Sequence, residues 1–221
     1  MFLFCHFSWK KDDDKTWKTI NFLVSKRYAF MFWKLFYWQY LSKYLIHIFS
    51  SHKKETLNKK DKYGYTVLHH AVYRNNVALV EKLFSFKDLD VHAVDEQGNN
   101  ALHLAANATP PNPKMIKTLI DKIGLLGKVG LNKESKTCLH IAASTGYLDG
   151  VWEILRQPEH KVILEKKDGR GQTPLTIAAA SGNQKVVNLL LENGANIRQK
   201  NWNKESAIHI SARYLRIKLI R

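Results

Sequence analysis

The sequence predicts an all-α solenoid of stacked helix-turn-helix units, joined by β-hairpin-like fingers, over residues 61–221. Five segments of this region align with one another, and they begin at Asp61, Asp95, Asn132, Asp168 and Asn201. Their central apolar residues lie 34, 37, 36 and 33 positions apart, and self-similarity at such a period is the signature of a repeat architecture. Because one such unit cannot bury its apolar face alone, neighbouring units are expected to stack.

The start of a helix is marked two positions before each central apolar residue. A side-chain oxygen at that position can accept a hydrogen bond from an unpaired backbone N–H, which contributes about 0.5–2 kcal/mol. The five capping residues are Thr66, Asn100, Thr137, Thr173 and Ser206, and the central apolar residues are Leu68, Leu102, Leu139, Leu175 and Ile208. Pro174 follows its cap at the first helical position, where the missing N–H costs nothing.

A turn and a second helix complete each unit. Gly146 and Gly182 fall where the first helix should end in a left-handed conformation, and Asn75 takes that place in the first unit. An apolar pattern then predicts the second helix, as over residues 184–191. Between the second and third units, residues 107–113 replace the glycine turn, and their three prolines predict a longer exposed connection.

Residues 157–161 extend the finger that leads into the fourth unit. This segment and residues 107–113 are interpreted as neutral loops, with an added contact surface as the alternative.

With these motifs the chain resembles the ankyrin-repeat family, whose signature is T-P-L-H-x-A at a period of about 33. The resemblance covers residues 61–221 and implies an ankyrin-repeat solenoid that acts as a scaffold or adaptor, with no catalysis and no cofactor. Residues 64–76, 90–106 and 171–197 also resemble the ankyrin arrays of transient receptor potential channels of the ankyrin type. That second resemblance implies an alternative function, the cytosolic N-terminal array of a cation channel.

The resemblance to ankyrin repeats also implies where a partner binds. In that family, partners contact the fingertips and the exposed face of the first helices. Carried onto this sequence, the fingertip residues are Lys62, Tyr63, Tyr65, Glu96, Gln97, Asn99, Lys133, Glu134, Lys136, Arg170, Gln172, Trp202, Asn203 and Glu205. Tyr73 and Arg74 are expected on the adjoining concave surface. Because Tyr, Trp and Arg are frequent interface anchors, Tyr63, Tyr65, Arg74, Arg170 and Trp202 are the strongest candidates.

The formal net charge of +16 attracts acidic protein faces, anionic lipid and nucleic acid alike, so it indicates only the sign of a partner. The expected partner is another protein with an acidic face, without specific nucleic-acid recognition. Residues 1–60 carry half of the excess, with 12 basic and 4 acidic side chains. The two cysteines, Cys5 and Cys138, lack the spacing of a disulfide framework or a zinc site, which favours a reducing, cytoplasmic location. If the chain is part of a channel, the location is the cytosolic side of a membrane.

Residues 1–60 are expected to form a separate basic and aromatic segment. Residues 28–49 contain ten aromatic side chains, but Lys34 and Gln39 interrupt a membrane span. A capping helix over the first unit, a helix of residues 26–54 lying on a membrane surface, and a non-native sequence all remain open. At the other end, the fifth unit stops about one turn into its second helix, which suggests a piece of a longer protein or a truncated gene product.

No catalytic or metal site is expected from the sequence. The recurring histidines, His69, His103, His140 and His209, hold equivalent positions one unit apart. They are therefore interpreted as hydrogen-bonding supports for neighbouring turns and not as metal ligands. The sequence also lacks a phosphate-binding loop and a nucleophile elbow.

Overall fold

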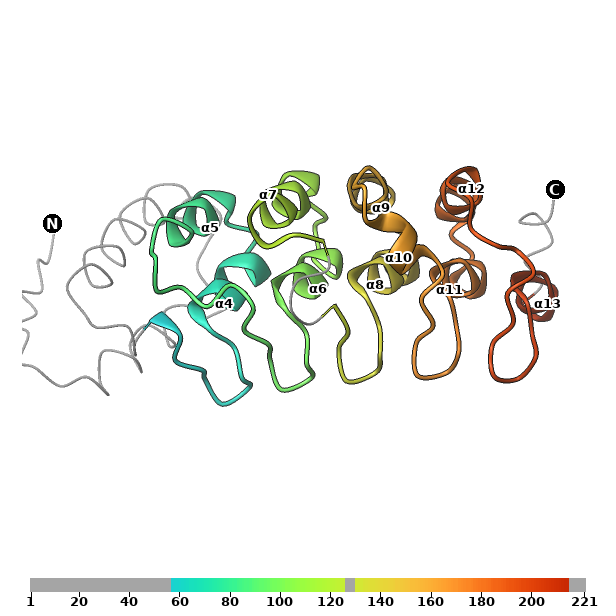
Figure 1. The fold of residues 1–221 in the computed structure, drawn as a ribbon, viewed down its shortest axis with the longest axis horizontal. Coiled ribbons are helices and arrows are strands. Elements are labelled where there is room, and N and C mark those ends of the chain that lie inside the picture. Colours follow the sequence, from blue (N-terminus) through green and yellow to red (C-terminus); the bar gives the residue numbers. More distant parts are fainter. Residues whose placement is uncertain (1–56, 126–129, 215–221) are drawn as a thin grey trace, which may run out of the picture. The chain divides into compact units, whose positions relative to one another are not determined.

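The computed structural model describes residues 57–125 and 130–214, which belong to one compact unit spanning residues 51–221. All regular structure in these residues is helical (Figure 1). The helices are α4 (Val67–Tyr73), α5 (Val77–Leu83), α6 (Ala101–Ala106), α7 (Pro113–Ile123), α8 (Cys138–Thr145), α9 (Leu148–Leu155), α10 (His160–Leu164), α11 (Pro174–Ser181), α12 (Gln184–Glu192) and α13 (Ala207–Arg213). The all-α prediction is confirmed for this part of the chain.

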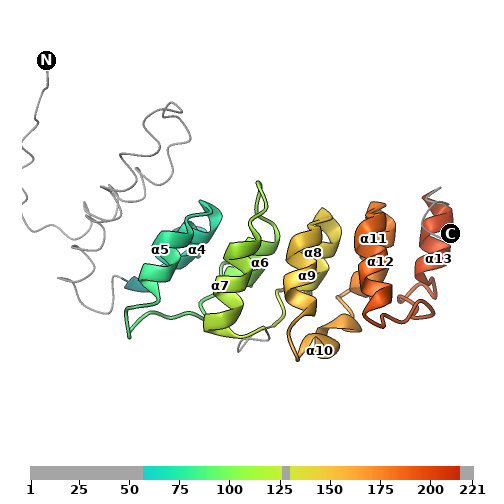
Figure 2. The same ribbon diagram turned by 90° about the horizontal axis from the view of Figure 1, so that it is seen from above.

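The helices form two layers in the order that the repeat predicts. The first helices of the five units, α4, α6, α8, α11 and α13, stand side by side in one layer, and α5, α7, α9 and α12 form the other (Figures 1 and 2). Within the described residues, the fifth unit consists of its finger and α13 alone. Each first helix contacts the first helix of the next unit, so the units stack as expected.

The predicted helix starts and turns are confirmed. All five capping residues directly precede a first helix, and Oδ1 of Asn100, for example, accepts the backbone N–H of His103 at 3.1 Å. Gly146, Gly182 and Asn75 follow the first helices with φ values of 73°, 76° and 57°. This left-handed turn lets the second helix fold back on the first.

The two irregular segments differ from their prediction. Residues 107–113 lie inside the second unit, between α6 and α7, and not between the second and third units. Pro113 begins α7, because proline is tolerated at the first helical position and Asn112 caps the helix. Residues 157–161 are not only a loop, since His160 and Lys161 begin the short helix α10, which buries Ile163 and Leu164.

The core runs through the stack along the central apolar residues. Leu68, Leu102, Leu139 and Leu175 are each at most 1% exposed. Full burial of a leucine stabilises a fold by about 1.5–3 kcal/mol, so these positions hold the units together. The equivalent Ile208 in α13 is 43% exposed, because no further unit covers it within the described residues.

Two predictions concern residues outside the described ranges. These are the capping or membrane-contact helix of residues 26–54 and the interrupted second helix beyond Tyr214. Among the residues that the structure describes, no helix has the length and apolar character that crossing a membrane requires.

Candidate functional site

The fingers are hydrogen-bonded hairpins that an Asp or Asn side chain closes. In the fourth finger, residues 168–172, the backbone N–H of Asp168 donates to the carbonyl of Gln172 at 2.9 Å. Oδ1 of Asp168 accepts the backbone N–H groups of Arg170 and Gln172 at 2.9 and 2.8 Å. The same side-chain turn recurs at the start of the other fingers, at Asp61, Asp95, Asn132 and Asn201. The predicted hairpin-like form therefore holds, although none of the described residues forms a regular strand.

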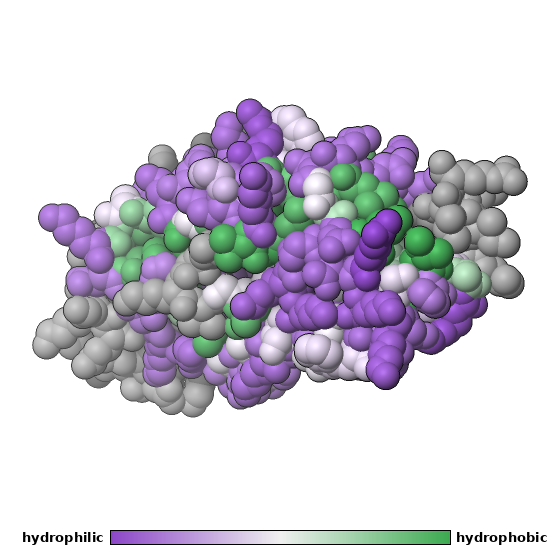
Figure 3. Space-filling model, turned by 45° about the vertical axis from the view of Figure 1, so that its right-hand side comes forward, coloured by the Kyte–Doolittle hydropathy of each residue, from purple (hydrophilic) through white to green (hydrophobic). Residues whose placement is uncertain are grey.

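Neighbouring fingers are joined at their tips by backbone hydrogen bonds. The four bonds run from Glu96 to Tyr63, from Lys133 to Gln97, from Gly169 to Glu134 and from Trp202 to Arg170, with lengths of 3.1, 3.0, 2.9 and 3.3 Å. The fingers thus form a continuous edge below the helices (Figure 1). This edge holds the fingertip side chains at a fixed spacing, and its outer surface is mostly hydrophilic (Figure 3, lower edge).

Two of the repeated histidines, His103 and His140, support the turns of the next unit, as predicted. Nε2 of His103 lies 2.9 Å from the carbonyl oxygen of Lys136, and Nε2 of His140 lies 3.1 Å from that of Gln172. The nearby backbone carbonyl of Asn99 partly opposes the lowering of the pKa of His69 by burial. Nε2 of His69 itself has no hydrogen-bond partner among the described residues.

His69, His103 and His140 are neutral because they are buried. Burial lowers the pKa of His69 and His140 to about 4 and also lowers the pKa of His103. In His140, Nδ1 accepts the backbone N–H of Thr137 at 3.1 Å. Since a carbonyl can only accept, the proton of the neutral ring must sit on Nε2.

The predicted partner-binding residues divide into two groups by exposure. Ten of them are exposed, namely Lys62, Tyr63, Tyr73, Glu96, Gln97, Lys133, Glu134, Arg170, Trp202 and Asn203. Six are half-buried, namely Tyr65, Arg74, Asn99, Lys136, Gln172 and Glu205. The exposed group lies at the fingertips and at the end of α4, where a partner can reach it.

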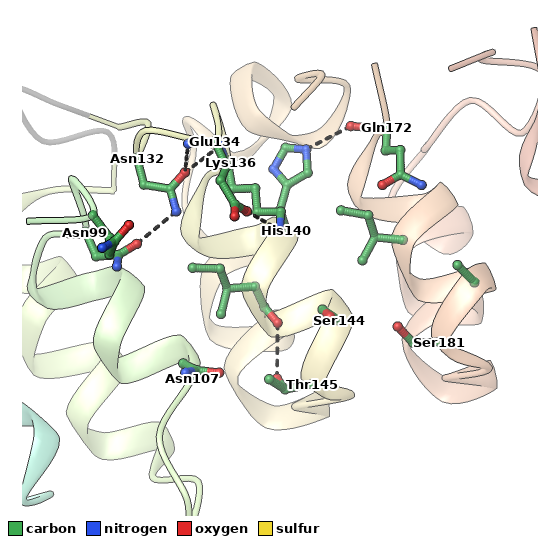
Figure 4. A pocket seen from close by; sticks show the side chains of 14 residues that line it. Asn99, Asn107, Asn132, Glu134, Lys136, His140, Ser144, Thr145, Gln172 and Ser181 are labelled. Carbon is green, nitrogen blue, oxygen red and sulfur yellow. Dashed lines mark hydrogen bonds and ion pairs between the residues drawn. The ribbon is translucent and has the colours of Figure 1, made fainter. Parts of the chain in front are cut away.

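A hollow of about 410 Å³ lies between the middle fingers and the first helices, and we call it the groove (Figure 4). Its lining residues are Gln97, Asn99, Asn107, Asn132, Glu134, Lys136, His140, Ile141, Ser144, Thr145, Gln172, Ile177, Ala180 and Ser181. The groove brings together five of the predicted residues, Gln97, Asn99, Glu134, Lys136 and Gln172. The other predicted residues do not line it.

Several lining residues were missing from the sequence-based prediction. Ile141, Ser144 and Thr145 follow their cap by four, seven and eight positions, and Ile177, Ala180 and Ser181 do the same in the fourth unit. These offsets place them on one face of the first helix, so the helical period could have identified them. The Asp and Asn residues that close the fingers recur five positions before each cap, and this spacing is the sequence signal for their role.

Three of the predicted residues also hold the fold together. The Tyr65 ring lies 5.9 Å from His69 and 5.5 Å from His70, measured between ring centroids. Trp202 packs against Gly171 of the preceding finger, and Glu205 pairs with Arg213. A substitution at any of these three would therefore disturb the fold as well as a binding surface.

The groove can form hydrogen bonds, and its lining contains few ionisable groups. Its ionisable groups are the buried His140 and an ion pair in which Nζ of Lys136 lies 2.5 Å from Oε2 of Glu134. The hydrogen bond from Lys136 lowers the pKa of Glu134. Among the described residues, no group of three or more His, Cys, Asp or Glu side chains could hold a metal ion.

Stacked helix pairs, hydrogen-bonded fingers and a polar groove define a helical-repeat protein whose exposed edge and groove are open to another molecule. The model of the ankyrin repeats (3 copies) matches residues 40–128, 68–163, 115–201 and 139–221. The chain therefore belongs to the ankyrin-repeat family, and ankyrin repeats are protein–protein interaction modules.

Curated relatives share this region at moderate identity. The chain is 29% identical over 188 residues to the B-cell lymphoma 3 protein homolog of Mus musculus, covering 67% of this chain and 41% of the relative. It is 31% identical over 142 residues to transient receptor potential cation channel subfamily A member 1 of Homo sapiens, covering 62% and 12%. The Homo sapiens ankyrin and armadillo repeat-containing protein is 28% identical over 172 residues, covering 76% and 12%. The chain thus spans less than half the length of these relatives.

Proposed function

We propose that this chain is a non-catalytic scaffold or adaptor that binds a partner protein in the cytoplasm through its groove and fingertips. The groove carries this proposal, because it is the hollow that brings residues of three fingers and two first helices to one place (Figure 4). Ligand sites in proteins are typically concave and largely preformed, with polar groups converging on them.

The fingertips favour an acidic face on the partner. Lys62, Lys133 and Arg170 are exposed at the tips of the first, third and fourth fingers. Two acidic side chains lie between them: Glu134 is already paired with Lys136, and Glu96 is exposed at the tip of the second finger, so the cations remain in excess. An array of cations along a rigid edge attracts and orients an acidic surface.

The first test places a large cation in the groove. Ser144 is exposed on α8 and lines the groove, whereas Asn188 is exposed on α12 in the other layer of helices. The full chain, carrying Ser144→Arg or Asn188→Arg, would be used as bait for chemical crosslinking in cell extract. We expect Ser144→Arg to lose partners that the parent chain and Asn188→Arg both retain. Identical crosslinked partners for all three chains would refute the proposal.

A second test concerns the fingertips. Lys133→Glu combined with Arg170→Glu reverses two exposed charges that make no side-chain ion pair with other described residues. Capture of the same partner should weaken with this variant and with rising salt, because exposed charges are screened within about 10 Å at 0.1 M ionic strength. If neither the charge-reversal variant nor rising salt weakened capture, the acidic-face proposal would be contradicted. The proposal that the groove binds a partner would be unaffected.

A second candidate function is the cytosolic array of a transient receptor potential channel of the ankyrin type. The observation that favours it is the 31% identity to such a channel over 142 residues. Sequencing the transcript beyond the codon for Arg221 tests it. Six apolar segments of about 20 residues each would support a channel, and a soluble domain or a stop codon would favour the adaptor.

A further inference from the structure

The groove is nearly uncharged, although the protein as a whole has a net charge of +16. Its one exposed ion pair is neutral as a unit, because Lys136 and Glu134 contact each other directly. Burial keeps His140 neutral as well. A ligand in the groove therefore meets polar groups and not a charge of either sign.

Five polar side chains of the groove are free to bind. Gln97, Asn107, Ser144, Gln172 and Ser181 make no side-chain hydrogen bond to any other residue within 57–125 and 130–214. By contrast, the amides of Asn99 and Asn132 are joined to each other at 2.8 Å. Each free amide can donate and accept at once, which is also what a polypeptide backbone does.

The free groups are spaced along the stack. Gln97 belongs to the second finger, Ser144 to α8 in the third repeat, and Gln172 to the fourth finger. Packed helices lie about 8–10 Å apart, so Gln97 and Gln172 are separated by roughly 20 Å along the stack. A β-strand rises about 3.3 Å per residue, so roughly six residues of extended chain would span that length.

The floor of the groove suits small side chains. Ile141 and Ile177 give it apolar contact area, and Ala180 leaves room for close approach. The lining contains no Phe, Tyr or Trp side chain and no unpaired cation. Single-stranded nucleic acid is bound by aromatic stacking in a positively charged groove, so this composition does not favour it.

We propose that the groove binds an extended, uncharged segment of a partner protein, about six residues long and held mainly through its backbone. This inference rests on the proposed function and adds the kind of segment that is recognised. Gln97 and Gln172 bind the peptide backbone at the two ends of the segment, and Ser144 binds it between them. The cationic fingertips lie outside the segment and contact other parts of the partner.

The test uses a displayed library of random peptides, about 12 residues long, selected on the full chain. We expect the enriched peptides to share an uncharged stretch of about six residues. Affinity of a synthetic copy should change by less than about twofold between 50 and 500 mM NaCl, since no net charge is neutralised. N-methylation of a backbone nitrogen within the stretch should weaken binding about tenfold, because it removes a donor.

Matched variants locate the peptide. Gln172→Ala should weaken binding about 2–10-fold, the effect of one lost hydrogen bond. Gln199→Ala removes the same amide outside the groove lining and should leave binding unchanged. Enrichment of acidic peptides with steep salt dependence would overturn the inference, as would the absence of any enriched peptide.

A fluorescent 12-residue oligouridylate serves as the counter-probe. Its binding would overturn the inference if Gln172→Ala abolished it and Gln199→Ala did not. This inference can fail without contradicting the proposed function. If Ser144→Arg abolishes capture of a partner protein but no uncharged peptide is selected, the groove is a binding site and only the nature of the segment is wrong.

Discussion

Nε2 of His140 lies 3.1 Å from the carbonyl oxygen of Gln172, so one side chain joins the third repeat to the finger of the fourth. The other nitrogen of the same ring accepts the backbone N–H of Thr137, the cap of its own helix. In the fourth repeat Thr176 takes the place of the histidine, and its hydroxyl donates to the carbonyl of Thr173 at 2.8 Å. The contact between the fourth and fifth repeats therefore lacks this histidine bridge.

His140→Ala should destabilise the array strongly. The substitution leaves a cavity and removes the hydrogen-bond acceptor of the buried N–H of Thr137. We therefore expect a loss of about 2–4 kcal/mol in the free energy of unfolding. Urea denaturation of the full chain, followed by circular dichroism, measures this loss. His209→Ala is the matched control, because His209 has the same place in its repeat but is exposed. Equal losses for the two variants would contradict the bridging role.

Acid should destabilise the fold through the same histidines. The pKa of His69 and His140 is about 4 in the folded chain and about 6.5 in the unfolded chain, so the unfolded state binds more protons between these values. The stabilisation is complete above about pH 6.5 and is lost as the pH falls towards 4. Each histidine should contribute a loss of about 2 kcal/mol between pH 7.5 and pH 5.

The pH dependence is measured as urea midpoints of the parent chain and of His140→Asn, which keeps a polar side chain but does not titrate. The parent should lose more stability than the variant on moving from pH 7.5 to pH 5. Parallel curves for the two proteins would show that His140 does not bind a proton on unfolding in this range.

The repeat period and the caps were predictable because they depend on local chemistry. A hydroxyl or amide two positions before a leucine caps a helix wherever it occurs, and Thr137 and Asn100 do so here. Likewise, the left-handed turn at Gly146 follows from the absence of a Cβ. Residues 157–161 were harder, because α10 forms by burying Ile163 and Leu164, a tertiary contact with no local signature.

The groove was only partly predictable for a related reason. The fingertip residues followed from the resemblance to other ankyrin repeats, and five of them do line the groove. Ser144 and Ser181 have neither charge nor aromatic character, so composition does not single them out. Their place in the groove arises from the stacking of α8 beside α11, which brings two helix surfaces together as one lining.

Gly171→Ala should weaken the contact between the fourth and fifth fingers. Gly171 has a φ of 74°, and a Cβ there would lie 2.7 Å from the backbone nitrogen of Trp202. Gly194→Ala is the control, since Gly194 has a φ of 89° but open space around its Cβ position. The control should cost about 1–2 kcal/mol from backbone strain alone, and Gly171→Ala at least about 1 kcal/mol more. Thermal unfolding of the two variants with equal midpoints would exclude the steric contribution.

Ser135→Gly should stabilise the array. Glycine occupies the left-handed position of the first, second and fourth fingers, whereas Ser135 adopts φ 58° in the third. A left-handed conformation costs a residue with a Cβ about 1–2 kcal/mol, and glycine loses about 0.5–1 kcal/mol of that gain through its flexible unfolded state. We therefore expect a net gain of about 0.5 kcal/mol, read as a higher urea midpoint at unchanged slope. Ser144→Gly makes the same substitution inside α8, where glycine is unfavourable, and should lower the midpoint instead. A lower midpoint for both variants would mean that the backbone at Ser135 is not strained.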